Sequence, residues 1–133
     1  MCKRMLICKT LGIVFGLLCV SLAASGGGEV WGTALMLTIL FNRLLIGVVV
    51  ALAGFISIHP VFQFRIYPWL RGFLVGALVS LYIAIGMFIA PSGLPNIWTI
   101  FWMTILVGGI YGMIIDVVAT KFSAEGEDLF KEK

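Results

Sequence analysis

Four long apolar runs dominate this sequence and restrict how the chain can fold. They are Met5–Ala24, Trp31–Ile58, Trp69–Ala90 and Ile97–Thr120. Each is close to or longer than the roughly 20 residues that a helix needs to cross about 30 Å of hydrocarbon. Of the 133 residues, 62% are hydrophobic and only 11% are charged, which excludes an ordinary soluble domain. The runs therefore predict a polytopic membrane protein.

Helix is the expected conformation of every run. Lipid offers no hydrogen-bonding partners to the backbone, and the runs lack the polar and apolar alternation of a membrane β-strand. We therefore expect an all-α integral membrane protein built as an antiparallel four-helix transmembrane bundle. Residues 1–133 would form one polytopic domain, in which residues 121–133 make a short cytoplasmic tail.

The first run has a second interpretation as a secretory signal peptide. Basic residues precede it, and Ser21–Ala24 has the small residues of a cleavage site. Removal of residues 1–23 would leave three helices. Against removal, Gly12 and Gly16 form a small-residue face of the kind that a retained, packed helix uses.

Basic residues set the expected orientation of the bundle. They lie before and at the start of the first run, surround the connection between the second and third runs, and follow the fourth run, while the other two connections contain no Lys or Arg. These residues are Lys3, Arg4, Lys9, Arg65, Arg71, Lys121, Lys131 and Lys133. Because Lys and Arg collect on the cytoplasmic side, we expect both termini in the cytoplasm and the protein in the cell (inner) membrane. The net charge of +3 belongs to these flanks and gives no nucleic-acid surface.

Small residues recur at an interval of four in every run. Residues four apart share a helix face, so each pair forms a strip on which another backbone can approach closely. The strips close one compact bundle, or at least one of them faces a second copy or another membrane protein. The pairs are Gly12 and Gly16, Gly47 and Ala51, Gly72 and Gly76, and Gly108 and Gly112.

A mid-membrane arginine is the most unusual polar residue. Arg43 lies about ten residues from the outer end of its run, or roughly 15 Å along a helix, which is near the midplane. An unpartnered arginine there is costly, so we expect hydroxyls, helix carbonyls or water to satisfy it. The candidate intramembrane polar site is Arg43 with Asn42, Ser80, Tyr82, Thr104 and Tyr111.

One carboxylate lies inside the runs, near the inner end. Asp116 is about four residues, or roughly 6 Å, from the end of the fourth run, and Arg71 lies at a similar depth. We therefore predict an Arg71–Asp116 ion pair. A direct Arg43–Asp116 pair is the second choice, because it requires the second helix to slide inward by about two turns.

No catalytic or metal-binding pattern stands out. The chain has one histidine and three cysteines, without the spacing of a metal site or a nucleophile with its base. We expect no enzyme, no metal and no cofactor, and the lipid bilayer as the first partner. The first expected function is an accessory or structural protein that acts through helix–helix contacts. The alternative is a small oligomeric channel or carrier for an anionic solute, because the planar Arg43 fork can hold a carboxylate or phosphate.

Overall fold

The computed structural model describes residues 2–26, 30–58, 65–89 and 96–123. It contains four helices, each long and apolar enough to cross a membrane, and these ranges contain no strand beyond an isolated bridge between Ile58 and Arg65. The prediction of an all-helical chain with four such helices is confirmed. Most of the predicted tail, residues 124–133, lies outside the described residues. The helices are α1 (Cys2–Ser25), α2 (Ala34–Ala53), α3 (Pro68–Ile89) and α4 (Ile97–Phe122).

The second helix is shorter at both ends than the predicted Trp31–Ile58. Before α2, Thr33 is extended (φ −96°, ψ 165°) and Gly32 has a φ of +76°, a left-handed conformation that glycine adopts without strain. After α2, the amide of Ile66 donates to the carbonyl of Ser57 at 2.9 Å, which holds the chain extended. Hydropathy alone did not reveal these ends, because apolar residues continue beyond the helix on both sides.

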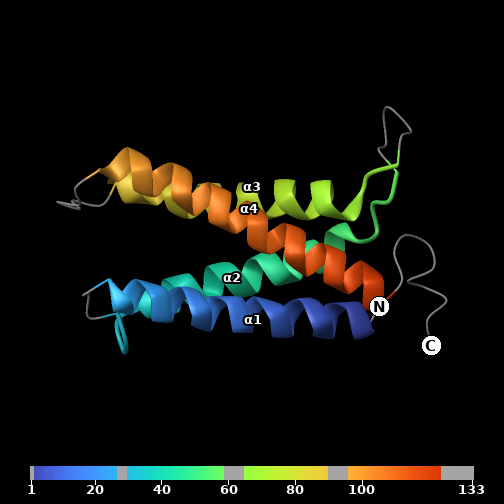
Figure 1. Ribbon diagram of the computed structural model, residues 1–133, viewed down its shortest axis with the longest axis horizontal. Coiled ribbons are helices and arrows are strands. Elements are labelled where there is room, and N and C mark those ends of the chain that lie inside the picture. The colour runs from blue at the N-terminus through green and yellow to red at the C-terminus, as the bar shows by residue number, and fades with distance from the viewer. Residues whose placement is uncertain (1, 27–29, 59–64, 90–95, 124–133) are drawn as a thin grey trace.

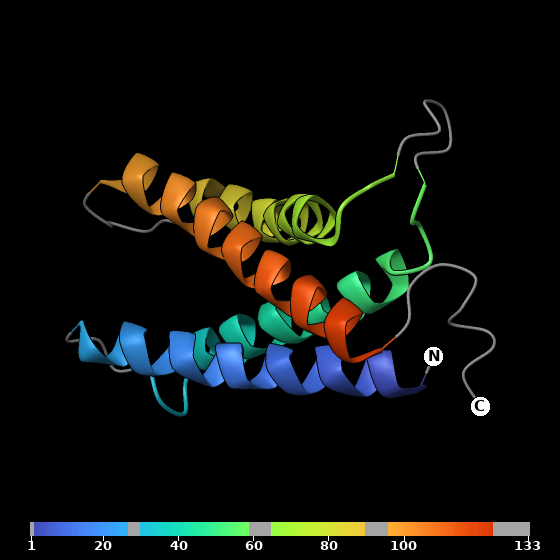
Figure 2. The same cartoon turned by 45° about the vertical axis from the view of Figure 1, so that its right-hand side comes forward.

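The helices are arranged as two closely packed pairs, α1 with α2 and α3 with α4 (Figure 1). The C-terminal part of α4 crosses over α1 at one end of the molecule. At the other end the two pairs diverge, so that the helices are arranged as a wedge (Figure 2). This arrangement gives the molecule a closed end, where both α1 begins and α4 finishes, and an open end.

The small-residue strips make the contacts inside each pair. A Cβ built on Gly12 would lie 2.8 Å from the carbonyl oxygen of Arg43 on α2, and one built on Gly112 would lie 2.9 Å from Cα of Gly76 on α3. Side chains cannot be accommodated at such distances. Each glycine strip is therefore occupied within the chain. The other strip glycines also face the adjacent helix at close range; they are Gly16, Gly47, Gly72 and Gly108. Ala51 is buried in the core.

The close approach of α3 to α4 predicts a large effect of a single methyl group. Gly76→Ala should lower the stability of the protein by about 1–3 kcal/mol, because the new Cβ would meet the backbone of Gly108. Gly86→Ala is the matched control, since a Cβ there has no neighbour within 4 Å. Thermal unfolding of the purified protein in detergent measures both variants. Equal melting temperatures for the two would contradict the described packing.

Candidate functional site

Arg71 and Asp116 form a buried ion pair at the closed end of the wedge. Nε of Arg71 donates to Oδ2 of Asp116 at 2.8 Å, and Nη2 donates to Oδ1 at 3.0 Å. This two-bond geometry is the strongest that an arginine and a carboxylate can adopt. Both side chains are buried, and the structure brings together the two residues that depth counting selected.

A second arginine, Arg4 of α1, also binds Asp116, and the sequence did not predict this contact. Its Nη2 donates to Oδ1 of Asp116, and its Nη1 donates to the Thr120 hydroxyl at 3.1 Å. Its position in the basic flank predicts a solvated side chain, yet Arg4 is only 1% exposed. A usable signal exists: steps of four back from Gly12 reach the buried Cys8 and then Arg4, which share that helix face.

The charge cluster, defined as Arg4, Arg71, Asp116 and Thr120, joins three of the four helices and the segment that follows the remaining one. Arg4 comes from α1, Arg71 from α3, and the other two residues from α4. The remaining connection is to the segment after α2, where Nη1 of Arg71 donates to the carbonyl of Ile56 at 2.9 Å. Buried charges are tolerated only when they are paired and hydrogen-bonded, so these contacts fix how the pairs meet.

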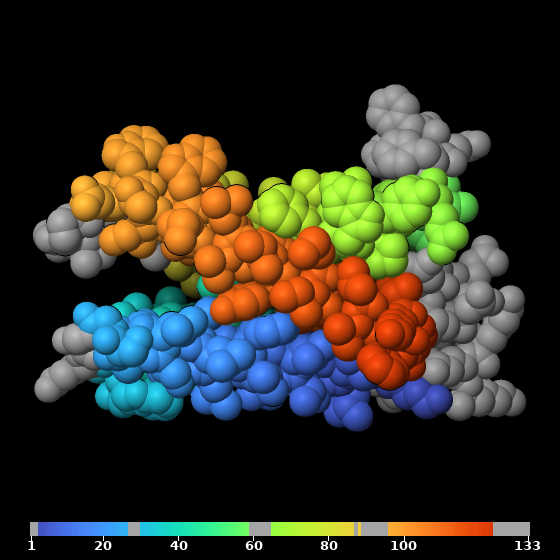
Figure 3. Space-filling model, viewed as in Figure 1, coloured from blue at the N-terminus to red at the C-terminus, as the bar shows by residue number. Residues whose placement is uncertain are grey.

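A cavity of about 630 Å³ fills the wedge between the two helix pairs. Figure 3 shows the hollow between α1 and the N-terminal half of α4. The volume is within the roughly 300–1,000 Å³ typical of small-molecule sites. Its lining is mostly apolar and consists of Cys19, Leu22, Ala23, Leu35, Thr38, Ile39, Asn42, Arg43, Ile83, Thr99, Ile100, Met103, Thr104, Val107 and Tyr111.

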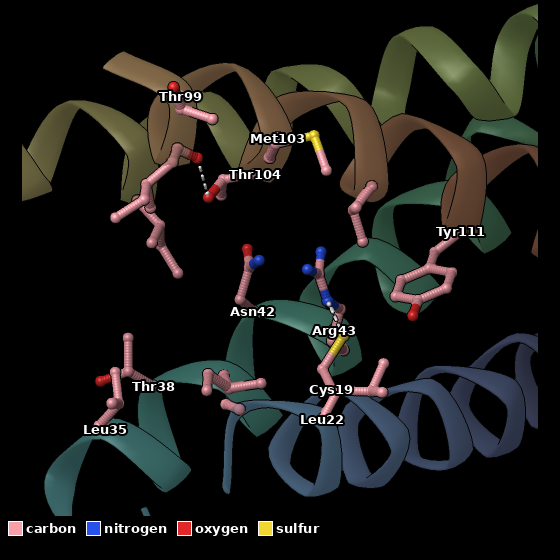
Figure 4. Close-up of a pocket in the computed structure, with 15 residues that line it drawn as sticks. Cys19, Leu22, Leu35, Thr38, Asn42, Arg43, Thr99, Met103, Thr104 and Tyr111 are labelled. Carbon is pink, nitrogen blue, oxygen red and sulfur yellow. Dashed lines mark hydrogen bonds between the residues drawn. The ribbon is translucent and has the colours of Figure 1, made fainter. Parts of the chain in front are cut away.

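Arg43 lies at the narrow end of this cavity and contacts neutral groups (Figure 4). Its Nε donates to Sγ of Cys19 at 3.3 Å, and its Nη1 donates to the hydroxyl of Ser80 at 3.4 Å. The guanidinium carbon is 5.1 Å from the centre of the Tyr111 ring, a cation–π contact. Tyr111 in turn stacks on Phe15, with the ring centres 4.6 Å apart. None of these partners neutralises the charge.

Arg43 and its neighbour Asn42 both direct polar groups into the cavity (Figure 4). Their side chains are only 7% and 6% exposed. Of the five N–H groups of an arginine, two are used by the described residues, and within the same part of the chain the Asn42 amide makes no hydrogen bond. Buried donors of this kind normally have partners. Both residues therefore have donors available to a molecule in the cavity.

The other predicted members of the polar site divide into two groups. Thr104 lines the cavity, and its hydroxyl donates to the carbonyl of Ile100 at 2.8 Å. Tyr82 is outside the site, because its side chain is 77% exposed while Ser80 is fully buried. Two residues along a helix are separated by about 200° around its axis, so Ser80 and Tyr82 could not share a face. Tyr82 was predicted only from its depth along the helix, and depth does not determine which face of the helix a side chain occupies.

Two residues of α1 belong to the site although the sequence analysis did not select them. Cys19 accepts a bond from Arg43, and Phe15 supports the Tyr111 ring. Both lie four or fewer residues from Gly16, where α1 approaches α2 closely. An apolar side chain in an apolar run carries no signal that marks it as part of a site.

The site is characterised by its geometry alone. No known protein family, characterised protein or solved structure matches this chain.

The charge cluster predicts strong coupling between its members. Asp116→Asn should destabilise the protein by about 3–5 kcal/mol, because two buried arginines lose their carboxylate. Arg4→Gln should cost less, since Arg71 remains bound to Asp116. Combining Asp116→Asn with Arg71→Gln should cost less than the sum of the two single changes.

Unfolding free energies measured in mixed detergent and denaturant provide this comparison. Lys121→Gln is the control, because Lys121 is an exposed residue of the same helix. Single effects that add to within about 0.5 kcal/mol would show independent sites and would rule out the coupling.

Proposed function

We propose that this protein is a non-enzymatic multi-pass membrane protein that binds an anionic solute at Arg43, as a small channel or carrier does. One observation carries the proposal: a buried guanidinium faces a cavity, and in the described part of the chain it contacts only neutral groups. A guanidinium stays charged at every physiological pH. An anion in the cavity would supply the missing countercharge.

The donor geometry favours a carboxylate or phosphate. A planar guanidinium offers two parallel N–H bonds to such a group, and the adjacent Asn42 amide can add a third. The ring of Tyr111 also holds the guanidinium by a cation–π contact. Arg43 is thereby oriented before a ligand arrives, which lowers the entropy cost of binding.

The proposed membrane arrangement is antiparallel, with both termini in the cytoplasm. It rests on the four apolar helices and on the distribution of Lys and Arg along the sequence. The charge cluster then lies near the cytoplasmic surface, and the wedge opens toward the opposite side. Arg43 lies between them, about nine residues or roughly 14 Å along α2 from its first residue.

The accessory role is the second candidate, and the bonds of Arg43 to Cys19 and Ser80 favour it. They connect α2 to α1 and to α3, so Arg43 can act as a clamp between the helix pairs. In this role a partner protein would contact a surface other than the glycine strips, which are occupied inside the chain. Such a protein could act as a single copy or as a homo-oligomer.

Arg43→Gln separates the two candidates. For the wild type in a buffer with only a bulky anion, added acetate, octanoate or phosphate should raise stability. At ten times the dissociation constant the expected gain is about 1.4 kcal/mol. Arg43→Gln should fold and lose this response, while Arg65→Gln, the same change at an exposed position, should keep it. Thermal unfolding in detergent gives the measurement.

The clamp role predicts the opposite pattern. Arg43→Gln would then fail to fold or would lose stability in every buffer. The wild type would show no stabilisation by any of the three anions, and that result would end the anion-binding proposal.

A further inference from the structure

We infer that the anion bound at Arg43 is the carboxylate headgroup of a long-chain fatty acid that enters from the bilayer, with its hydrocarbon chain against the apolar walls of the wedge. This inference rests on the proposed function and specifies the ligand of the same site. It is supported by the composition of the walls, the volume of the cavity and the position of the charge.

The walls beyond Arg43 are suited to a hydrocarbon chain. On the α1 and α2 side they are formed by aliphatic residues, and the facing side chains of α3 and α4 are of the same kind. The Thr38 hydroxyl, one of the few polar groups there, donates to its own helix at the Ala34 carbonyl. These walls consist mainly of Leu22, Leu35, Ile39, Ile83, Ile100, Met103 and Val107.

A small hydrated anion reaches Arg43 at a greater free-energy cost than a fatty acid does. From the open end it would pass about 14 Å of this wall, where none of the described lining residues other than Arg43 carries a charge. Loss of its water there would be unfavourable. For a fatty acid the free-energy cost of entry is smaller, because its chain is already in hydrocarbon and only the headgroup moves from one polar environment to another.

The polar end of the cavity matches a single carboxylate. Arg43 and Asn42 are adjacent in sequence, and their side chains point the same way across the gap toward Thr104 (Figure 4). One planar acceptor group can receive donors from both residues. The cavity of about 630 Å³ far exceeds the needs of such a group alone, and the remaining space is apolar.

Native mass spectrometry of the full chain in a neutral detergent tests this inference, with three probes at equal concentration. Palmitate carries both the chain and the charge, hexadecanol carries the chain alone, and acetate carries the charge alone. We expect one palmitate per chain and no comparable retention of hexadecanol or acetate. Arg43→Gln should bind palmitate at least about tenfold more weakly, the factor that one charge-assisted hydrogen bond contributes, and Arg65→Gln should match the wild type.

The outcomes separate this inference from the proposed function. Equal affinity for acetate and palmitate would overturn the fatty-acid inference and leave the anion site in place. Hexadecanol binding as tightly as palmitate would overturn it as well, because the cavity would then select hydrocarbon and not charge. If palmitate does not bind and none of acetate, octanoate and phosphate stabilises the protein, the proposed function itself fails.

A variant of the wall gives a test that does not alter Arg43. Val107→Trp would fill the apolar part of the cavity, since Val107 lines it on the helix opposite Arg43. Palmitate binding should fall at least about tenfold. Unchanged palmitate binding by this variant would place the chain elsewhere and overturn the inference.

Discussion

The cost of removing charge from water determines the organisation of this molecule. The carboxylate of Asp116 accepts bonds from arginines of two different helices, Arg4 of α1 and Arg71 of α3. None of these groups could be buried alone without a penalty of several kcal/mol. Because Arg71 also bonds the segment after α2, one carboxylate holds the two helix pairs together at a single end.

Packing inside the pairs and packing between them follow different rules. Within a pair, glycines such as Gly12 and Gly76 bring backbones into direct contact, and this contact needs no polar groups. Between the pairs, the described contacts include charges, hydroxyls and the stacked rings of Phe15 and Tyr111. Contacts of the second kind are concentrated toward one end. The wedge, and the cavity within it, lies toward the other end.

The sequence predicted the helices and part of the site, each for a physical reason. Hydropathy identified four helices because a backbone in lipid has no alternative to helix, but it overestimated α2, whose flanking residues are apolar without being helical. Depth counting selected Arg71 and Asp116, since length along a helix is fixed. It failed for Tyr82, because depth ignores rotation about the axis, and it missed Arg4, because a basic residue near a helix end is normally solvated. The cavity at Arg43 depends on how two helix pairs cross, which no single run encodes.

The position of Asp116 on α4 has a consequence for the order in which the fold can form. During synthesis Arg4 and Arg71 are both made before the residue that neutralises them, so neither has its carboxylate partner until α4 is made. In the proposed membrane arrangement, the two guanidinium groups would stay at the membrane surface until α4 is made, in contact with water or lipid phosphate. Closure of the bundle is therefore coupled to completion of its last helix, and a chain stopped before Asp116 would retain two arginines with no buried site to enter.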